Sequence, residues 1–119
     1  MMEYFDVLTE NGEFEGRKET REVCHEKGLW HKSVHVWVIN DKNEILLQYR
    51  CADKKLYPDT WDVSFAGHID AGESSIEAVI REGKEELGID VDLDKLSYVF
   101  TNREEIKYDI VDILTSNIS

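Results

Sequence analysis

The sequence contains few of the residues that mark secreted, thiolate-metal or membrane proteins. Its 119 residues include two cysteines and one proline. Cys24 and Cys51 form no C-x-x-C spacing, so we expect free thiols in a reducing cytosol rather than disulfides or a thiolate metal site. No apolar stretch approaches the roughly 20 residues of a membrane-spanning helix, and residues 1–10 lack the basic and apolar regions of a signal peptide. These absences predict a cytoplasmic protein.

Positive charge is also scarce. The chain has 14 basic and 26 acidic residues, which gives a formal net charge of −12 at pH 7. This charge disfavours nucleic acid and anionic membranes as direct partners, because both are polyanions. An anionic substrate would need cations to mediate its binding. The hydrophobic content of 41% is too high for a disordered acidic tail, and the length fits a single domain over residues 1–119.

Alternating apolar residues and turn signals predict several strands. Within residues 33–40, three valines alternate with His35, Trp37 and Ile39. Because both faces of this segment are largely apolar, we expect a central strand there, with residues 44–49 pairing antiparallel to it. An Asn-Gly turn signal also predicts an N-terminal hairpin. The predicted strands are residues 3–8, 13–23, 33–40, 44–49, 61–66, 96–101 and 106–114.

The sequence predicts a helix over residues 74–86. Ser74 or Ser75 can cap its N-terminus, and Gly88 is typical of the position that follows a helix C-terminus. We expect the apolar residues at helical spacing to face the core. These residues are Ile76, Val79, Ile80 and Leu87.

Three carboxylates are clustered on this predicted helix. Glu82, Glu85 and Glu86 are spaced i, i+3 and i+4, so they share one face. Packing like charges in this way costs a few tenths of a kcal/mol per pair in an isolated helix. Hard divalent cations prefer oxygen ligands, so the cluster is a candidate metal site that would bridge the protein and an anionic phosphate. The alternative is a solvated face of a glutamate-rich helix.

The order of residues around these carboxylates is more specific than their number. Residues 67–89 read G-x5-E-x7-R-E-G-x-E-E-x-G-I. This string resembles the Nudix box, G-x5-E-x7-R-E-U-x-E-E-x-G-U, in which U is a bulky aliphatic residue. All seven fixed residues and the final aliphatic residue are present. Gly83 departs from the pattern at the first U position, where glycine weakens a helix by up to about 1 kcal/mol relative to alanine.

The resemblance to Nudix hydrolases implies an α/β fold, an α/β/α sandwich with a mixed sheet and one loop–helix–loop box. It also implies hydrolysis of a diphosphate linked to another moiety, by attack of water with Mg²⁺ or Mn²⁺ as cofactor. The implied metal ligands are Glu82, Glu85, Glu86 and the carbonyl of Gly67. Glu82 or a nearby carboxylate such as Glu85 would act as the base, Arg81 would orient a glutamate, and Glu73 would support the set.

Residues 28–70 also resemble the Nudix branch that includes type 1 isopentenyl-diphosphate isomerases. In those enzymes the residues that match Arg50 and Lys54 hold the diphosphate. Histidines that match His25, His31 and His68 help to form a separate metal site, and we also expect His68 to contact the substrate. The alternatives are hydrogen-bonded structural histidines and a solvated loop around Lys54.

The isomerase reaction is disfavoured at one position. The essential isomerase cysteine falls at Ala66, and alanine cannot transfer a proton to or from carbon. The isomerase box also lacks the glutamate found here at Glu82. The sequence therefore favours a hydrolase, with nucleoside diphosphate derivatives, dinucleotide polyphosphates and isoprenoid-type diphosphates as candidate substrates. A catalytically silent nucleotide-binding module and an acidic interaction protein remain the other classes.

The resemblance covers residues 1–101. Nudix domains usually continue with further strands and a C-terminal helix, so we expect a fold that is shortened at its C-terminus. A missing strand would expose a sheet edge and apolar surface. We therefore expect a homodimer in which the partner covers that surface.

Overall fold

The computed structural model describes residues 3–42, 44–49, 61–62, 64–105 and 107–117. The predicted substrate ligands Arg50 and Lys54, and the free thiol predicted at Cys51, lie outside these described residues. Among the described parts of the chain, no helix has the length and apolarity needed to cross a membrane.

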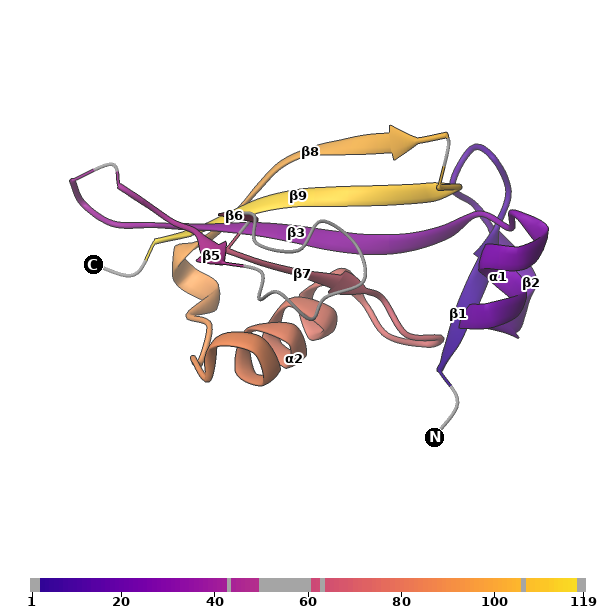
Figure 1. The fold of residues 1–119 in the computed structure, drawn as a ribbon, viewed down its shortest axis with the longest axis horizontal. Helices are drawn as coiled ribbons and strands as arrows, with labels where there is room; N and C mark the ends of the chain where they lie inside the picture. The colour runs from indigo at the N-terminus through magenta and orange to yellow at the C-terminus, as the bar shows by residue number, and fades with distance from the viewer. Residues whose placement is uncertain (1–2, 43, 50–60, 63, 106, 118–119) are drawn as a thin grey trace.

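A five-stranded mixed sheet forms the centre of the protein (Figure 1). Strand β3 (His31–Ile39) pairs in parallel with β9 (Asp109–Asn117) and antiparallel with both β4 (Ile45–Leu46) and β7 (Phe65–His68). Strand β8 (Leu96–Glu104) pairs antiparallel with the other edge of β9. The central strand predicted over residues 33–40 and the mixed α/β class are therefore confirmed.

Two predicted strands are shorter than expected. Residues 44–49 divide between β4 and β5 (Gln48–Tyr49), and residues 61–66 divide between β6 (Trp61–Asp62), which pairs with β5, and β7. Ser64 explains part of the break, because its buried hydroxyl accepts a hydrogen bond from the backbone N–H of Val38 at 2.8 Å and donates one to the carbonyl of Leu46. A side chain thus takes the place of ladder hydrogen bonds at this point.

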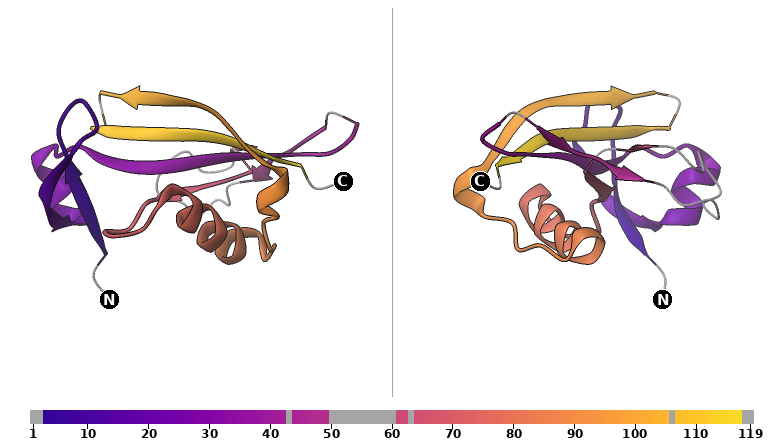
Figure 2. Two further views of the ribbon diagram at one scale, coloured as in Figure 1. Left: turned by 180° about the vertical axis from the view of Figure 1, so that it is seen from behind. Right: turned by 60° about the vertical axis from the view of Figure 1, so that its left-hand side comes forward.

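Helix α2 (Ser75–Leu87) covers one face of the sheet (Figures 1 and 2). Ser74 caps it in a complete capping box with Glu77, and Gly88 ends it in the left-handed conformation. The valines of β3 that face it are buried with Phe65 and Val79, which confirms the predicted apolar alternation of the strand.

The predicted apolar stripe of α2 is only partly buried. Val79 is buried, but Ile76 and Ile80 are 41% and 42% exposed. Gly83 accounts for the difference, because a Cβ there would lie 2.9 Å from Val91 and 3.3 Å from Phe65. The helix therefore approaches the core most closely along its Val79 and Gly83 side. At Gly83, where the box pattern has a bulky aliphatic residue, neighbouring side chains fill the space that such a residue would take.

The N-terminal segment packs against one end of the sheet. Strands β1 (Tyr4–Leu8) and β2 (Phe14–Thr20) form the predicted hairpin. The strand predicted over residues 13–23 is wrong beyond Thr20, where the Thr20 hydroxyl accepts from the N–H of Val23 and starts helix α1 (Arg21–Lys27). A 3-10 turn, η1 (Leu93–Lys95), was not predicted and leads into β8.

Candidate active site

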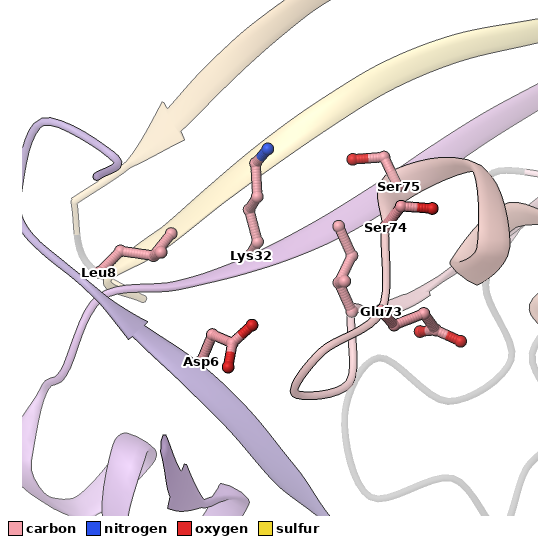
Figure 3. A pocket seen from close by; sticks show the side chains of 7 residues that line it. Asp6, Leu8, Lys32, Glu73, Ser74 and Ser75 are labelled. Atoms are coloured by element: carbon pink, nitrogen blue, oxygen red, sulfur yellow. The ribbon is translucent and has the colours of Figure 1, made fainter. Parts of the chain in front are cut away.

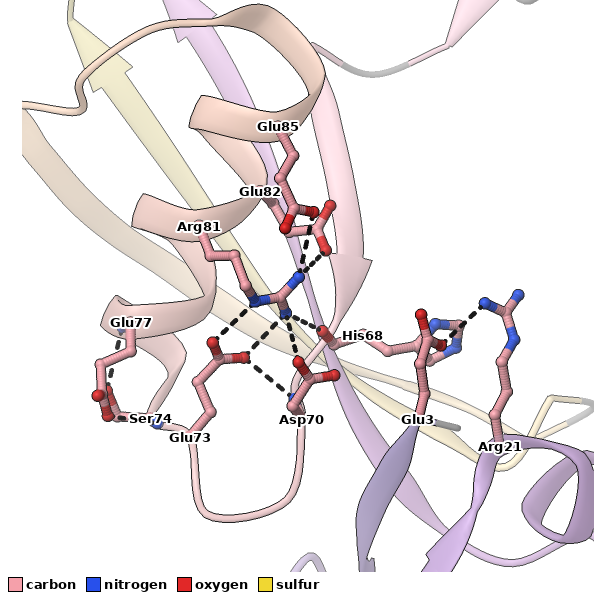
Figure 4. Close-up of polar contacts among 10 residues, drawn as sticks. All are labelled: Glu3, Arg21, His68, Asp70, Glu73, Ser74, Glu77, Arg81, Glu82 and Glu85. Atoms are coloured by element: carbon pink, nitrogen blue, oxygen red, sulfur yellow. Dashed lines mark hydrogen bonds and ion pairs between the residues drawn. The ribbon is translucent and has the colours of Figure 1, made fainter. Parts of the chain in front are cut away.

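Arg81 connects the box helix to the loop that precedes it (Figure 4). Its Nε and Nη2 donate to the two carboxylate oxygens of Glu73, each at 2.9 Å, and Nη2 also donates to the carbonyl of His68 at 3.0 Å. Its Nη1 donates to Oε1 of Glu82 at 2.6 Å. The N–H of Asp70 donates to Glu73 as well, at 3.1 Å. Arg81 thereby fixes the loop, strand β7 and Glu82 relative to one another.

Charge pairing and burial shift the pKa values of these carboxylates in opposite directions. Hydrogen bonds from Arg81 hold the pKa of Glu73 below its usual value, and Glu73 in turn raises the pKa of Arg81. Burial raises the pKa of Glu82, whose side chain is only 12% exposed, despite its bond to Arg81. Glu82 is therefore a carboxylate that a further cation beside it would stabilise in its ionised form.

Glu82 touches the backbone of β7 at Gly67. A Cβ on Gly67 would lie 2.3 Å from Cδ of Glu82 and 2.5 and 2.6 Å from its two oxygens. Such distances are shorter than any non-bonded contact, so any larger residue at this position would force the Glu82 carboxylate to move. The pattern residue Gly67 thus allows the carboxylate and the strand to meet.

Replacing Gly67 by alanine is expected to displace the Glu82 carboxylate. We expect kcat/KM for the hydrolysis that the sequence resemblance implies to fall by about 100-fold, because a displacement of about 1 Å at a catalytic group has effects of that size. Gly72→Ala is the control, since its added methyl meets nothing within 4 Å. Unchanged kcat/KM in Gly67→Ala would contradict the required contact.

The other two carboxylates of the box are more exposed. Glu86 accepts from the N–H of Ala66 at 3.3 Å, whereas Glu85 is 61% exposed and lies 3.5 Å from Nη1 of Arg81. The three carboxylates do not bring one oxygen each within 4.8 Å of the others among the described residues. Nη1 of Arg81 lies between Glu82 and Glu85. The possible metal ligands are carboxylate oxygens on one helix face, and hard divalent cations prefer oxygen ligands.

Three histidines from separate elements meet beside this carboxylate face. His25 of α1, His31 of β3 and His68 of β7 each bring a ring nitrogen within 4.8 Å of the others. Phe5 stacks on His31 and His68 with centroids 5.3 and 4.7 Å apart. Nδ1 of His31 lies 2.8 Å from the carbonyl of Leu29, which leaves its Nε2 for another partner. The sequence-predicted histidine set is thus brought together by the fold.

Burial favours the neutral form of two of these imidazoles, those of His25 and His68. It lowers the pKa of His68 to about 3 and lowers the pKa of His25 as well, with neighbouring His31 adding to both effects. Neutral imidazole is the form that binds metal ions. The fold therefore favours the metal-binding form of His25 and His68.

His68 is expected to make the metal-free protein sensitive to acid. Its pKa is about 3 in the fold and about 6.5 in an unfolded chain. Below about pH 6.5 the unfolded chain binds a proton that the folded chain does not, so this contribution to stability is complete above 6.5 and declines as the pH falls toward 3. We expect a loss of about 2 kcal/mol between pH 6.5 and 4.5, measured by urea unfolding in EDTA. The slope should be shallower in His68→Gln, and an identical slope would contradict this origin.

Two of the box carboxylates and all three histidines border one cavity of about 740 Å³. Its lining includes Glu82, Glu86, Gly67 and His68, whereas Glu85 and Glu73 lie outside it. Of the site residues predicted from the sequence and described by the structure, some therefore line the cavity and others lie outside it.

Comparison with known proteins identifies the family. Residues 29–115 match the model of the NUDIX domain. The chain belongs to the Nudix family. Nudix hydrolase 3 of Arabidopsis thaliana is 41% identical over 104 residues, which cover 87% of this chain and 14% of that protein. An uncharacterized Nudix hydrolase of Clostridium acetobutylicum is 43% identical over 106 residues, which cover 87% of this chain and 50% of the relative.

This Nudix domain therefore spans half or less of the length of those two relatives. An isopentenyl-diphosphate Delta-isomerase of Escherichia coli is a more partial relative, 40% identical over 63 residues, or 53% of this chain and 35% of the isomerase. A Deinococcus radiodurans crystal structure has the same fold, with a TM-score of 0.76 and 24% identity over 98% of this chain and 73% of that one.

Sequence reasoning missed an acid of the Nudix domain that lines the cavity. Asp109 is buried at the start of β9, where its Oδ2 accepts from the hydroxyl of Ser33 at 2.7 Å. Its Oδ1 has no hydrogen-bond partner among the described residues, and burial raises its pKa. Its place in the predicted strand over residues 106–114 was the available signal, but that segment also contains Lys107 and Asp112, so Asp109 did not stand out.

A smaller cavity of about 300 Å³ lies between β1, β3 and the start of α2 (Figure 3). Lys32 and Ser75 line it, and both contact Asp112, at 3.5 Å and 2.7 Å. Both polar groups therefore already have Asp112 as a partner within the protein. The larger cavity is the candidate active site because the box residues Glu82 and Glu86 line it.

Proposed function

We propose that the protein is a divalent-metal-dependent hydrolase of a diphosphate linked to another organic moiety. The observation that carries this proposal is the arrangement of Arg81, which holds Glu82 at the wall of the main cavity while Glu73 fixes Arg81 from behind. Nudix proteins typically depend on a divalent cation and act on diphosphate compounds. An intact box in a domain of this family favours the same chemistry here.

The residues divide into those that bind and those that position. Glu82, Glu85 and Glu86, together with the carbonyl of Gly67, would hold Mg²⁺ or Mn²⁺. When bound, such a cation offsets phosphate charge and lowers the pKa of water. Glu82 would take the proton from the attacking water, because its desolvated carboxylate has a raised pKa and therefore a greater affinity for a proton. Arg81 keeps that carboxylate in place, and Glu73 keeps Arg81 in place.

The predicted substrate ligands extend this proposal. Arg50 and Lys54 would contact the diphosphate, and His68 would contribute from the cavity wall. The histidine cluster would hold a second metal ion of borderline hardness, such as Zn²⁺ or Mn²⁺, since neutral imidazoles suit such ions.

The second metal site can be tested without measuring catalysis. We expect Zn²⁺ to bind with a stoichiometry near one and to raise the melting temperature, and we expect His31→Gln to remove that effect. Glu82→Gln should retain zinc binding if the two sites are separate. A melting temperature that does not respond to zinc in the unmodified protein would favour the structural interpretation of the three histidines.

Two other functions remain as competing proposals. A silent diphosphate-binding module would show ligand-dependent thermal stabilisation without turnover. An isopentenyl-diphosphate isomerase has a partial relative in its favour, but Ala66 lines the cavity at the position that the resemblance gives to the isomerase cysteine. Alanine has no group that could transfer a proton.

The experiment that separates these functions is a panel of diphosphate substrates crossed with Mg²⁺, Mn²⁺ and EDTA. Release of phosphate products that requires the metal supports the hydrolase. Binding without release supports the silent module, and conversion of isopentenyl to dimethylallyl diphosphate supports the isomerase. A protein that neither binds nor converts any member of the panel would contradict all three.

We also propose a homodimer in the cytoplasm. Strand β8 is the outer strand of the described sheet beside β9, and it carries exposed Tyr98, Val99 and Phe100. Apolar side chains along an outer strand favour association. Light scattering that finds a stable monomer would contradict the dimer.

A further inference from the structure

The loop of residues 69–74, which joins β7 to α2 and is called the box loop below, has contacts that the proposed chemistry does not use. On the side of the box helix, Glu73 binds Arg81, which holds Glu82. The same loop also contacts strand β1. The NUDIX model matches residues 29–115, so β1 lies outside the matched part of the chain. Membership of the family therefore does not account for this second contact.

Two hydrogen bonds join β1 to the box loop. The N–H of Ala71 donates to the carbonyl of Tyr4 at 2.7 Å, and the N–H of Gly72 donates to Oδ2 of Asp6 at 3.1 Å. Figure 3 shows Asp6 on β1 beside the loop that leads to Glu73. The loop contributes only backbone N–H groups to these bonds, and a carboxylate accepts such bonds more strongly than a neutral group does. Asp6 is therefore the side chain through which the contact can be tested.

Strand β1 is a rigid support for this contact. Phe5 and Val7 are buried in the N-terminal core, and Asp6 lies between them in the strand. Because successive side chains of a strand point to opposite faces, Asp6 is directed away from that core. Phe5 also stacks on the rings of His31 and His68, which fixes β1 against β3 and β7. Asp6 thus holds the box loop from a strand that is itself held in place.

The contact is connected through the box loop to the proposed catalytic carboxylate. Gly72 is followed directly by Glu73, which accepts from the N–H of Asp70 at 3.1 Å and from Arg81 twice at 2.9 Å. Arg81 donates in turn to Glu82 at 2.6 Å. A box loop released from β1 would carry Glu73 with it, and Arg81 would then draw Glu82 out of place.

The surroundings of Asp6 leave room for substitution. Its side chain lines the smaller cavity together with Glu73 and Ser74 (Figure 3). A shorter side chain would enlarge a cavity that already exists and would leave Phe5 and Val7 in their core. The contact can therefore be removed without removing the buried groups that fold the hairpin.

We propose that Asp6 is a positioning residue of the active site, which fixes the box loop against β1 and thereby sets the position of Glu82. This assignment rests on the proposed function for its effect on catalysis, whereas its effect on the loop does not. It gives the N-terminal hairpin a part in the reaction, although the hairpin precedes the matched part of the chain.

Kinetics of Asp6→Ala and Asp6→Asn separate this role from a merely structural one. Asparagine can accept from the N–H of Gly72 through its side-chain carbonyl, whereas alanine cannot. We expect Asp6→Ala to lower kcat about 10-fold and to change KM by less than about 3-fold, because the shift reaches Glu82 only through intermediate groups. Asp6→Asn should retain kcat within about 2-fold. Glu15→Ala is the control, since Glu15 is exposed on β2 of the same hairpin and lines neither cavity.

A double variant identifies the route by which Asp6 acts. Glu73→Ala breaks the link between the box loop and Arg81. In that background Asp6→Ala should lower kcat by less than about 2-fold, because the shift of the loop no longer reaches Glu82. Effects of Asp6→Ala and Glu73→Ala that multiply independently would overturn the route through the loop.

Amide hydrogen exchange of the full chain, followed by NMR without metal or substrate, tests the contact without any turnover. The N–H of Gly72 should exchange about 5-fold faster in Asp6→Ala than in the unmodified protein, and at nearly the unmodified rate in Asp6→Asn. The N–H of Val36 in the central strand should exchange equally in all three proteins, because it reports global unfolding. An unchanged rate at Gly72 in Asp6→Ala would overturn the contact.

Circular dichroism checks that each variant is folded. Asp6→Ser replaces the alanine variant if that protein does not fold, because the serine hydroxyl is one bond shorter than the carboxylate oxygen that reaches Gly72. The same exchange rates and kinetic constants are then expected of the serine variant as of Asp6→Ala.

The two proposals can fail separately. Faster exchange at Gly72 in Asp6→Ala, in a protein that hydrolyses no diphosphate, would retain the hold of Asp6 on the box loop and reject the hydrolase. Metal-dependent hydrolysis with the same kcat in Asp6→Ala and in the unmodified protein would retain the hydrolase and reject the positioning role of Asp6.

Discussion

Glu82→Gln is expected to lower kcat/KM for diphosphate hydrolysis by about 1000-fold. The substitution keeps the size of the side chain and removes both the charge that would hold the metal and the group that would accept the proton of water. Loss of a general base alone costs about 100- to 10,000-fold. The measurement is the rate of phosphate release at saturating Mg²⁺ on the best substrate of the panel.

Glu77→Gln is the matched control for this variant. Glu77 lies in the first turn of the same helix and lines neither cavity. Glutamine can also complete a capping box, so helix α2 should form normally. Loss of activity in Glu77→Gln, or normal activity in Glu82→Gln, would contradict the role given to Glu82.

Arg81→Ala is expected to have the largest effect on stability. Arg81 is 27% exposed, and its partners Glu73 and Glu82 are 15% and 12% exposed. Removing the guanidinium leaves two largely buried carboxylates without their cation. We expect the free energy of unfolding at pH 7 to fall by about 2 to 3 kcal/mol, less than for a fully buried pair because water reaches part of the network. Urea unfolding by circular dichroism measures this loss.

Two further variants make this prediction specific. Arg81→Lys should recover only part of the stability, since an ammonium group cannot form the two parallel bonds that the guanidinium makes to Glu73. Lys84→Ala should change stability by less than about 0.5 kcal/mol, because its pair with Asp90 is exposed. Equal stabilities of Arg81→Ala and Lys84→Ala would rule out a structural role for the Arg81 network.

The sequence predicted those parts of the fold that depend on local patterns. Valines at every second position indicated β3, and Ser74 with Gly88 indicated both ends of α2, because alternation and capping involve residues close in the chain. Helix α1 was missed because its seven residues contain only two apolar ones, Val23 and Cys24. Its N-terminus depends on one side-chain bond from Thr20.

The spacing of the box predicted that four carboxylates lie near one arginine. It did not predict how closely each carboxylate approaches that arginine. That Glu73 and Glu82 contact Arg81 more closely than Glu85 does depends on the loop conformation and on the approach of Gly67, which are tertiary features. Asp109 was missed for the same reason. It comes from the distant strand β9, and its importance follows from burial rather than from spacing.

The parallel pairing of β3 with β9 has a consequence for synthesis of the protein. Each residue from His31 to Ile39 is paired with one from Asp109 to Asn117, and β9 separates β3 from β8. After residues 75–87 have been made and before residues 109–117 follow, the box helix therefore has only an incomplete sheet to pack against. Contacts between segments so distant in sequence form slowly, because a long loop must close first. The sheet on which the valines of β3 and the box helix pack is complete only when β9 has paired with β3. Until then chaperones can bind the exposed sheet.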